Sequence, residues 1–168
     1  AHRMYSLDGG EFAREIMSGD PHERHREAAG FEDDGLLSGR DRAKRLIYGT
    51  NYGAGHKKIG EIAKPSGVDW DVSRLVKEGK RLKRALFSAR PALKTLINRL
   101  KKNFKAGQLI TGLDGRVAEN RSAHQALNTQ LQMDGAIVMK WATAFLRRKV
   151  LAEGWEIGAD KDWALVGH

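Results

Sequence analysis

The chain has 168 residues, and its 30 Lys and Arg outnumber its 21 Asp and Glu, which makes the formal net charge +9. This length suits one domain and leaves no room for a second independent core. The sequence contains no cysteine, which excludes a disulfide scaffold and a cysteine-ligated zinc site and is compatible with an intracellular setting. No apolar run approaches the 18 residues that suggest a membrane span, so we expect no membrane partner.

The first part of the chain predicts short helices separated by a polar loop. Residues 12–17 begin an amphipathic helix that ends near Asp20. Asp20 followed by Pro21 is typical of an N-cap with proline at the first helical position, which predicts a second helix over residues 22–29. A polar, glycine-containing loop is expected over residues 31–39.

The next helix has a clear start and an unusual interior. Ser38 and Asp41 have the spacing of a capping box, which places the helix start just before Arg40. The helix runs to about Tyr52 and contains Gly49. An interior glycine costs roughly 1 kcal/mol relative to alanine, so we expect another group to approach closely there. The following Gly-Ala-Gly breaks this helix, and a short helix is expected over residues 56–63.

Four side chains of this helix recur at every fourth position: Arg40, Lys44, Tyr48 and Tyr52. On a helix they form one slowly drifting stripe. Two cations followed by two aromatic rings can neutralise phosphates at one end and stack on a sugar or base at the other. The spacing leaves a plainer interpretation open, namely a cationic helix face whose Tyr rings pack in the core.

Positive charge is concentrated further along the chain. From Arg74 to Lys105 there are twelve Lys or Arg and a single acid, Glu78. Leucines at helical spacing predict a helix over residues 71–88 and another that opens at Pro91, joined as an antiparallel pair. Such a segment favours a polyanion partner, because each neutralised phosphate releases counterions. The alternative is a solvated helix pair that keeps the protein soluble.

The last third predicts a mixed structure. A β-hairpin is expected over residues 108–119 around an Asp-Gly turn. A long helix should follow from Ser122 to about Glu153, with Gly135 as a candidate interruption. The apolar run at residues 163–166 is typical of a buried strand that is cut short. The predicted fold class is therefore mainly α, with a small β-hairpin and a truncated strand.

A second stripe lies on the predicted long helix. It is polar, and its members again recur at every fourth position: His124, Asn128 and Gln132. The apolar residues are expected on the opposite side of the helix: Leu127, Leu131 and Val138. The polar face should therefore meet something polar, or else remain a solvated helix face.

Four blocks of this sequence resemble family A DNA polymerases, and most closely their phage replicative branch. Arg40-x-x-x-Lys44-x-x-x-Tyr48-Gly-x-x-Tyr52-Gly53 resembles motif B, the fingers helix of that family. Residues 8–22 resemble the segment that follows motif A. Residues 112–116 and 124–132 resemble two palm segments, and all four blocks stand in the family's order. The resemblance implies a helical fingers subdomain at residues 1–105 and a partial α/β palm at residues 106–168.

The resemblance also implies roles for the first stripe. Arg40 and Lys44 would bind the γ- and α/β-phosphates of the incoming dNTP, and Lys44 would protonate the leaving pyrophosphate as a catalytic residue. Tyr48 would pack against the incoming sugar. His22 matches a phosphate-contacting histidine, although a surface histidine is the alternative from the sequence alone.

DNA contacts are implied for the remaining matched positions. Tyr52 matches the ring that occupies the template stacking position, with Gly53 next to it. The polar stripe of His124, Asn128 and Gln132 matches the face that reads the minor groove of the newly formed pair. Amide donors can read there without sequence preference, because every correct pair presents an acceptor. Arg116, after the Asp-Gly turn, is a candidate contact to the DNA backbone.

The implied reaction is template-directed transfer of a deoxynucleotide to a primer 3′-hydroxyl with two Mg²⁺ ions. In the family the metal-binding carboxylates come from motif A, before the residue that matches Ala1, and from a His-Asp-Glu motif that would begin at or just after His168. We therefore expect an internal fragment with no metal ligand, which is inactive alone.

The implied partners are primer–template DNA, dNTP and the remaining palm, thumb and any exonuclease domain of a parent polymerase, in the host cell cytoplasm. The alternative function is a non-catalytic basic helical module that binds nucleic acid.

Overall fold

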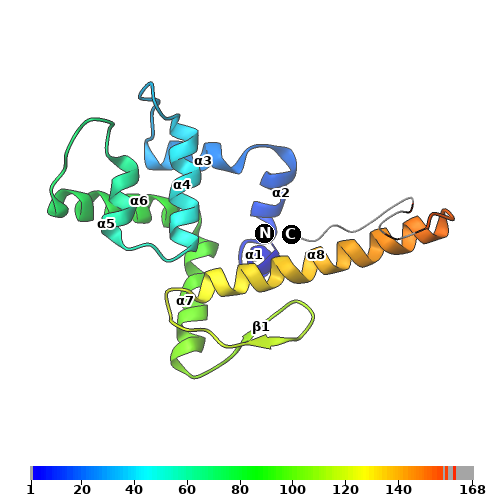
Figure 1. Cartoon of the computed structure of the whole chain (residues 1–168). Coiled ribbons are helices and arrows are strands. Elements are labelled where there is room, and N and C mark those ends of the chain that lie inside the picture. The colour runs from blue at the N-terminus through cyan, green and yellow to red at the C-terminus, as the bar shows by residue number, and fades with distance from the viewer. Residues whose placement is uncertain (1, 157, 159–160, 162–168) are drawn as a thin grey trace.

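A computed structural model describes residues 2–156, 158 and 161. Its described part is mostly helical, which confirms the predicted fold class (Figure 1). The elements in chain order are α1 (His2–Asp8), α2 (Glu11–Ser18), α3 (Pro21–Ala29), α4 (Gly39–Asn51), α5 (His56–Ala63), α6 (Val72–Ala89), α7 (Pro91–Lys105), β1 (Ile110–Thr111), β2 (Val117–Ala118) and α8 (Ala126–Ala152).

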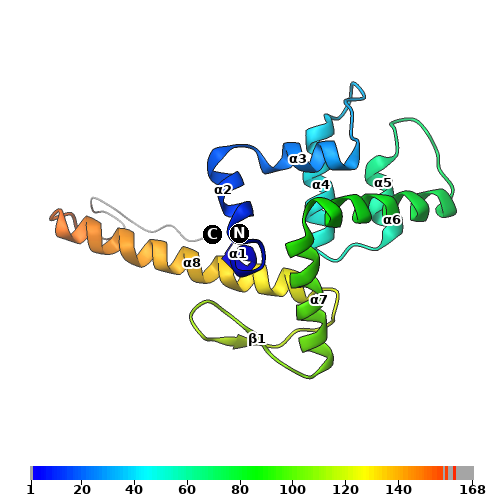
Figure 2. The same cartoon turned by 180° about the vertical axis from the view of Figure 1, so that it is seen from behind.

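The helices form two groups that α7 connects. Helices α3, α4, α5 and α6 gather at one end of the molecule, and α5 and α6 are the most extensively packed pair. Helix α7 leads from this group to α1, the hairpin and the start of α8, and α8 then projects away from the rest (Figures 1 and 2). No helix in this described part is long and apolar enough to cross a membrane.

Side-chain caps set the start of three helices. The Asp20 carboxylate accepts a hydrogen bond from the His22 amide at 2.9 Å, and the Ser38 hydroxyl accepts one from the Asp41 amide at 3.0 Å. Asp71 caps α6 in the same way. Each cap contributes about 1 kcal/mol by satisfying an amide that the helix leaves unpaired. The predicted starts of α3 and α4 are confirmed within a residue.

Glycines bring α4, α5 and α6 together around the core. A Cβ at Gly79 would lie 1.8 Å from the His56 carbonyl oxygen, so no other residue fits between the backbones of α5 and α6. At Gly49 a Cβ would lie 3.0 Å from Cδ1 of Ile59, which is fully buried. The close approach predicted at Gly49 is thereby confirmed.

The prediction that the two basic helices are antiparallel is wrong. Helix α7 begins at the end of α6 and continues in a direction that crosses the axis of α6, so it does not lie alongside it (Figures 1 and 2). One residue, Arg90, is both the C-cap of α6 and the N-cap of α7, with φ −136° and ψ 70°. A single linking residue before Pro91 cannot reverse the chain. Helix α6 therefore packs on α5 and α3, whereas α7 packs on α1 and α8.

Three further predictions meet the structure in different ways. The hairpin is confirmed, with antiparallel pairing of Ile110 to Ala118 and Thr111 to Val117. Helix α8 starts at Ala126, four residues later than predicted, and it continues through Gly135 without interruption. Helix α1 was not predicted. The strand predicted at residues 163–166 lies outside the described residues.

Candidate nucleotide and nucleic-acid site

The first stripe lies along the accessible side of α4. Arg40 is exposed, Lys44 is partly buried, and the side chains of Tyr48 and Tyr52 are 53% and 58% exposed. The interpretation that places these rings in the core is therefore wrong. The core positions of α4 are taken by other residues, chiefly Ala43, Leu46 and Thr50.

Helix α3 brings His22 to the stripe. The guanidinium of Arg40 donates to the carboxylate of Asp20, the residue that caps α3. The hydrogen bond from Arg40 is the largest cause of the lowered pKa of Asp20, and the charge of Arg40 lowers this pKa further. The ring centroids of His22 and Tyr48 are 6.5 Å apart, with the ring planes tilted by 52°. Three of the predicted nucleotide contacts, from two different helices, therefore lie together.

The surroundings of His22 favour its neutral form, and burial is the main cause. Burial lowers the pKa of His22, the positive charges of Arg40 and Lys44 lower it further, and Asp20 opposes them. A neutral imidazole can donate one hydrogen bond to a phosphate oxygen without adding a third positive charge. The first turn of α4 adds the positive end of its helix dipole to the same region. The arrangement is suited to a polyphosphate.

The last turn of α4 meets the start of α8. The Tyr52 hydroxyl accepts a hydrogen bond from the Gln132 side-chain amide at 3.4 Å. Gly53 has φ 75°, and a Cβ there would lie 2.3 Å from the carbonyl oxygen of His124. Gly53 is thus required both by its backbone conformation and by the close approach of the two segments. Four of the predicted DNA contacts are therefore brought to one junction.

The rest of the second stripe agrees only in part with its prediction. Asn128 is partly buried on α8, one turn before Gln132, whereas His124 is exposed in the turn that precedes the helix. On the other side of α8, Leu127 is buried, but Leu131 and Val138 remain 40% and 48% exposed.

Arg116 lies apart from this junction. It follows the hairpin turn, is exposed, and its guanidinium forms an ion pair with Asp114 at 2.7 Å. The structure does not bring it together with the α4 stripe.

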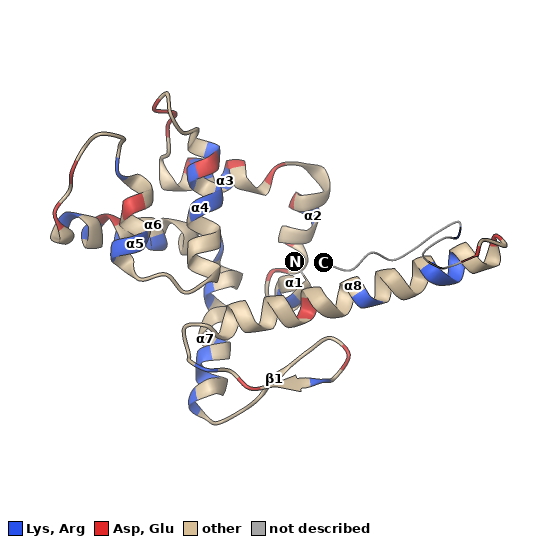
Figure 3. Cartoon of the chain, in the orientation of Figure 1, with Lys and Arg blue, Asp and Glu red and all other residues tan. Residues whose placement is uncertain are grey.

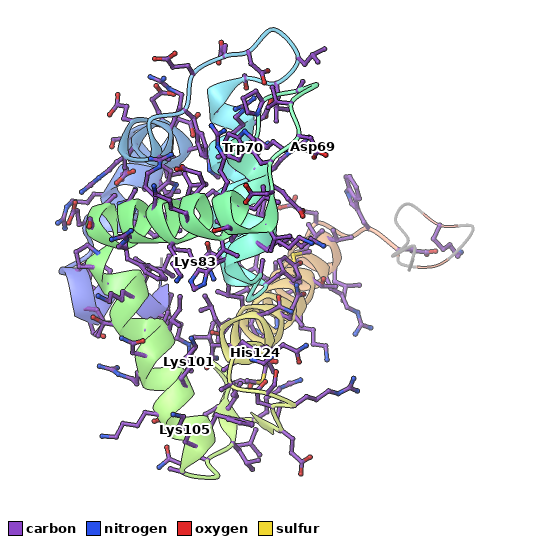
Figure 4. The ribbon with its side chains drawn as sticks, turned by 90° about the vertical axis from the view of Figure 1, so that its left-hand side faces the viewer. Asp69, Trp70, Lys83, Lys101, Lys105 and His124 are labelled. Carbon is purple, nitrogen blue, oxygen red and sulfur yellow. The ribbon has the colours of Figure 1, made fainter. Side chains whose placement is uncertain are left out.

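A basic surface follows α6 and α7 beside the junction. Figure 3 shows Lys and Arg along both helices. In Figure 4, Lys83, Lys101 and Lys105 descend along this side, and His124 lies beside them. The side chain of Lys83 is held in part by the protein itself, because its ammonium donates a hydrogen bond to the Ala54 carbonyl oxygen at 2.6 Å. Burial, followed by the charge of Lys101, lowers the pKa of Lys83.

Sequence reasoning missed a buried polar group that lies beneath His22. His25 and Arg90 are 2% and 4% exposed, and Arg90 also pairs with Glu15. The available signals were a pair of histidines one turn apart and an arginine immediately before the proline that opens α7.

The described residues do not provide a metal centre. Among residues 2–156, 158 and 161, no group of three or more His, Asp or Glu side chains is placed to hold a metal ion. The carboxylates of the site are committed to other partners, with Asp20 bound to Arg40 and Asp114 bound to Arg116. The residues present therefore do not fit a Mg²⁺ pair.

The fold is that of part of a DNA polymerase domain. No family model matches the chain. Among solved structures, the chain is similar to the POL domain of Pol1 from M. smegmatis in complex with DNA primer-template and dNTP. The TM-score is 0.63 at 19% sequence identity, and the match covers 82% of this chain and 25% of that one.

Curated relatives extend the likeness to the sequence. The DNA-directed DNA polymerases of Enterobacteria phage T3 and Escherichia phage T7 are each 35% identical over 180 residues, covering 99% of this chain and 23% of theirs. That of Escherichia phage Phieco32 is 37% identical over 140 residues, covering 79% of this chain and 20% of its own. The chain thus spans about a quarter of the length of these relatives or less. Sequence and fold together make the chain similar to a segment of these DNA-directed DNA polymerases, and they support the resemblance to family A that its motifs indicate.

Proposed function

We propose that this chain grips the incoming nucleotide and contacts the primer–template in a polymerase that transfers deoxynucleotides to a primer 3′-hydroxyl. The observation that carries the proposal is the meeting of His22 with the stripe of Arg40, Lys44 and Tyr48 on an exposed face of α4. The full lengths of the relatives, about four times the matched segment, support a larger parent enzyme.

Charge balance explains the proposed roles on α4. Negative charge builds up on the leaving pyrophosphate as the bond to the α-phosphate breaks. Lys44 supplies positive charge and a proton to that group, and Arg40 holds the γ-phosphate after exchanging its bond with Asp20. His22 donates to a phosphate oxygen, and the Tyr48 ring supports the sugar.

The junction between α4 and α8 serves the DNA in this proposal. Tyr52 and Gly53 lie at the template stacking position, and Gln132 is already within hydrogen-bonding distance of Tyr52. His124, Asn128 and Gln132 present donors to the acceptors that every base pair offers in its minor groove. Arg116 contacts the backbone outside the junction.

The parent enzyme supplies what the chain lacks in this proposal. Residues 1–105 form the fingers, and residues 106–168 form part of the palm. The remaining palm covers the apolar side chains that α8 exposes, which include Val138, Met139, Trp141 and Phe145. It also provides the carboxylates for two Mg²⁺ ions, and a thumb and any exonuclease domain complete the enzyme. The enzyme would work in the cytoplasm of the host cell, and the isolated chain would not extend a primer.

A second candidate function is a non-catalytic module that binds nucleic acid. The observation in its favour is the basic surface of α6 and α7. The two functions differ at α4, because a binding module has no use for a triphosphate grip.

The deciding experiment compares variants of the complete polymerase that carries this segment. Lys44→Ala should lower the incorporation rate about 10²-fold or more, as expected for the loss of a positioned charge in the transition state. Arg40→Ala should appear partly as weaker dNTP binding. The matched control is Arg45→Ala, which removes an exposed cation from another side of the same helix. Small and equal effects of Lys44→Ala, Arg40→Ala and Arg45→Ala would contradict the proposal.

A further inference from the structure

Arg90 joins three segments from a buried position. Its guanidinium donates to Nε2 of His25 on α3 at 3.0 Å and forms an ion pair with Glu15 on α2. It also lies over the ring of Phe12, 4.6 Å from the centroid. Since Arg90 is the single residue between α6 and α7, it connects the corner of these helices to α2 and α3.

The bond between Arg90 and His25 defines the state of the imidazole. Nε2 accepts a hydrogen bond, so in a neutral ring the proton is on Nδ1. Burial and then the charge of Arg90 lower the pKa of His25 to about 4, which keeps the ring neutral near pH 7. Burial would raise the pKa of Glu15, but Arg90 and Arg24 outweigh this effect and lower it, so Glu15 stays charged. The buried guanidinium therefore has a counter-charge.

The buried pair of His25 and Arg90 lies next to the proposed nucleotide site. The ring centroids of His25 and His22 are 6.2 Å apart, and His22 is 6.5 Å from Tyr48. Helix α3 has nine residues and packs against α4 and α6, with Ala29 as its buried hydrophobic residue. Exposed polar links join it to its neighbours through Asp20 and Arg40 and through Arg24 with Glu11 and Glu15, and Arg81 donates to the Ala29 carbonyl. The bond from Arg90 to His25 differs from these exposed ion pairs because both of its side chains are buried.

We propose that Arg90 is a positioning residue of the nucleotide site, which fixes α3 through His25 so that His22 meets the phosphates beside Tyr48. This inference rests on the proposed function. The Asp20–Arg40 link must open when Arg40 turns to a triphosphate, whereas the His25–Arg90 link is buried next to His22 and stays closed. A purely structural Arg90 would affect stability and every kinetic constant, whether or not His22 is present.

The experiment is a double-mutant cycle in the complete polymerase, with kcat and KM for a single dNTP and Tm measured for each variant. Arg90→Met keeps most of the volume and removes all donors. It should raise KM about tenfold with a smaller change in kcat, because a small misplacement of a binding group is costly. With His22→Ala already present, Arg90→Met should change KM less than about twofold, because the two residues act as one unit.

Two further variants test the same role of Arg90 if Arg90→Met folds poorly. Arg90→Lys retains the charge toward Glu15 and loses the fixed fork that reaches His25, so it should still raise KM. Arg24→Gln is the matched control, because Arg24 also pairs with Glu15, at 3.2 Å, and lies on the exposed side of α3. It should leave KM within about twofold, as expected for an exposed ion pair.

The outcomes separate this inference from the proposed function. An equal rise in KM from Arg90→Met with and without His22, or no rise at all from Arg90→Lys, would overturn the positioning role. In either case, a strongly reduced incorporation rate of the Lys44→Ala variant would show that the proposed polymerase function still holds. An incorporation rate of Lys44→Ala equal to that of the wild type would instead overturn the proposed function, and with it this inference.

Discussion

Two helices of this molecule expose aromatic rings, and the surroundings of those rings differ. On α4, Tyr48 and Tyr52 stand among Lys44, His22 and Gln132, and both carry a hydroxyl. On the projecting part of α8, 52% of the Trp141 side chain and 64% of the Phe145 side chain are exposed. Other large apolar side chains are exposed along the same helix: Val138, Met139, Leu146 and Leu151. Basic side chains lie between them, and the Lys149 ammonium is 6.0 Å from the centroid of the Phe145 ring.

The difference shows that exposure of a ring has two meanings. A ring with a polar handle, next to cations, can remain in water until a ligand arrives. A helix that exposes this many large apolar side chains has no such use for them in water, and it indicates a protein surface that is normally covered. We therefore propose that the α4 face serves nucleotide and DNA, and that the exposed part of α8 packs on the remaining palm of the parent enzyme.

The largest effect is expected for DNA binding by the basic surface of α6 and α7. If about six phosphates are contacted, the affinity of the chain for primer–template should fall on the order of 10³-fold between 50 and 200 mM salt. Replacing Lys80, Lys101 and Lys105 together by Gln should lower the slope of this dependence by about three, one for each lost contact.

The control for that titration removes three charges from the other region of the comparison: Lys140, Arg147 and Arg148 on α8. Its salt dependence should match the wild type, because these side chains lie on the projecting helix. A flat titration of the wild type, or equal losses from both triple variants, would contradict the assignment of the two regions.

A smaller effect is expected for sugar selection by Tyr48. If Tyr48 contacts the incoming sugar as proposed, its hydroxyl replaces the hydrogen bond that a missing 3′-hydroxyl would make, so dideoxynucleotides should be incorporated nearly as well as deoxynucleotides. Tyr48→Phe leaves that partner unsatisfied and should introduce discrimination of roughly 10²-fold or more. The measurement is the ratio of the two incorporation efficiencies.

Tyr52→Phe is the matched control for this measurement. It removes the other phenolic hydroxyl of the stripe, which is bonded to Gln132. It should leave the sugar ratio unchanged. A ratio that does not respond to Tyr48→Phe would show that this ring does not contact the sugar.

The smallest effect is expected for self-association through the apolar side chains that α8 exposes. Without the remaining palm, the isolated chain should self-associate through these side chains as its concentration rises. Replacing Trp141 and Phe145 together by Gln should weaken this association about tenfold, because rings that are buried only in part contribute less than the roughly 1.5–3 kcal/mol of a fully buried ring. Sedimentation velocity over a range of concentrations would measure it, and a wild-type chain that stays monomeric throughout would contradict it.

The sequence by itself determined the features that depend on local rules. Asp20 and Ser38 were identifiable as caps because their side chains satisfy amides two or three residues away. The stripe from Arg40 to Tyr52 follows from the helical period alone. The close approach at Gly49 and the hairpin were likewise predictable, since glycine destabilises a helix interior unless a neighbour needs the space, and an Asp-Gly pair favours a tight turn.

Only the tertiary structure decided which distant groups meet. The contact of Gly53 with the His124 carbonyl and the bond from Gln132 to Tyr52 join segments that are far apart in the chain. The direction of α7 likewise depends on which distant helices it packs against. No local pattern indicates that Arg90 reaches His25, 65 positions earlier. Such contacts depend on how complete helices pack, and packing follows from the shape of the whole core and not from the period of any one segment.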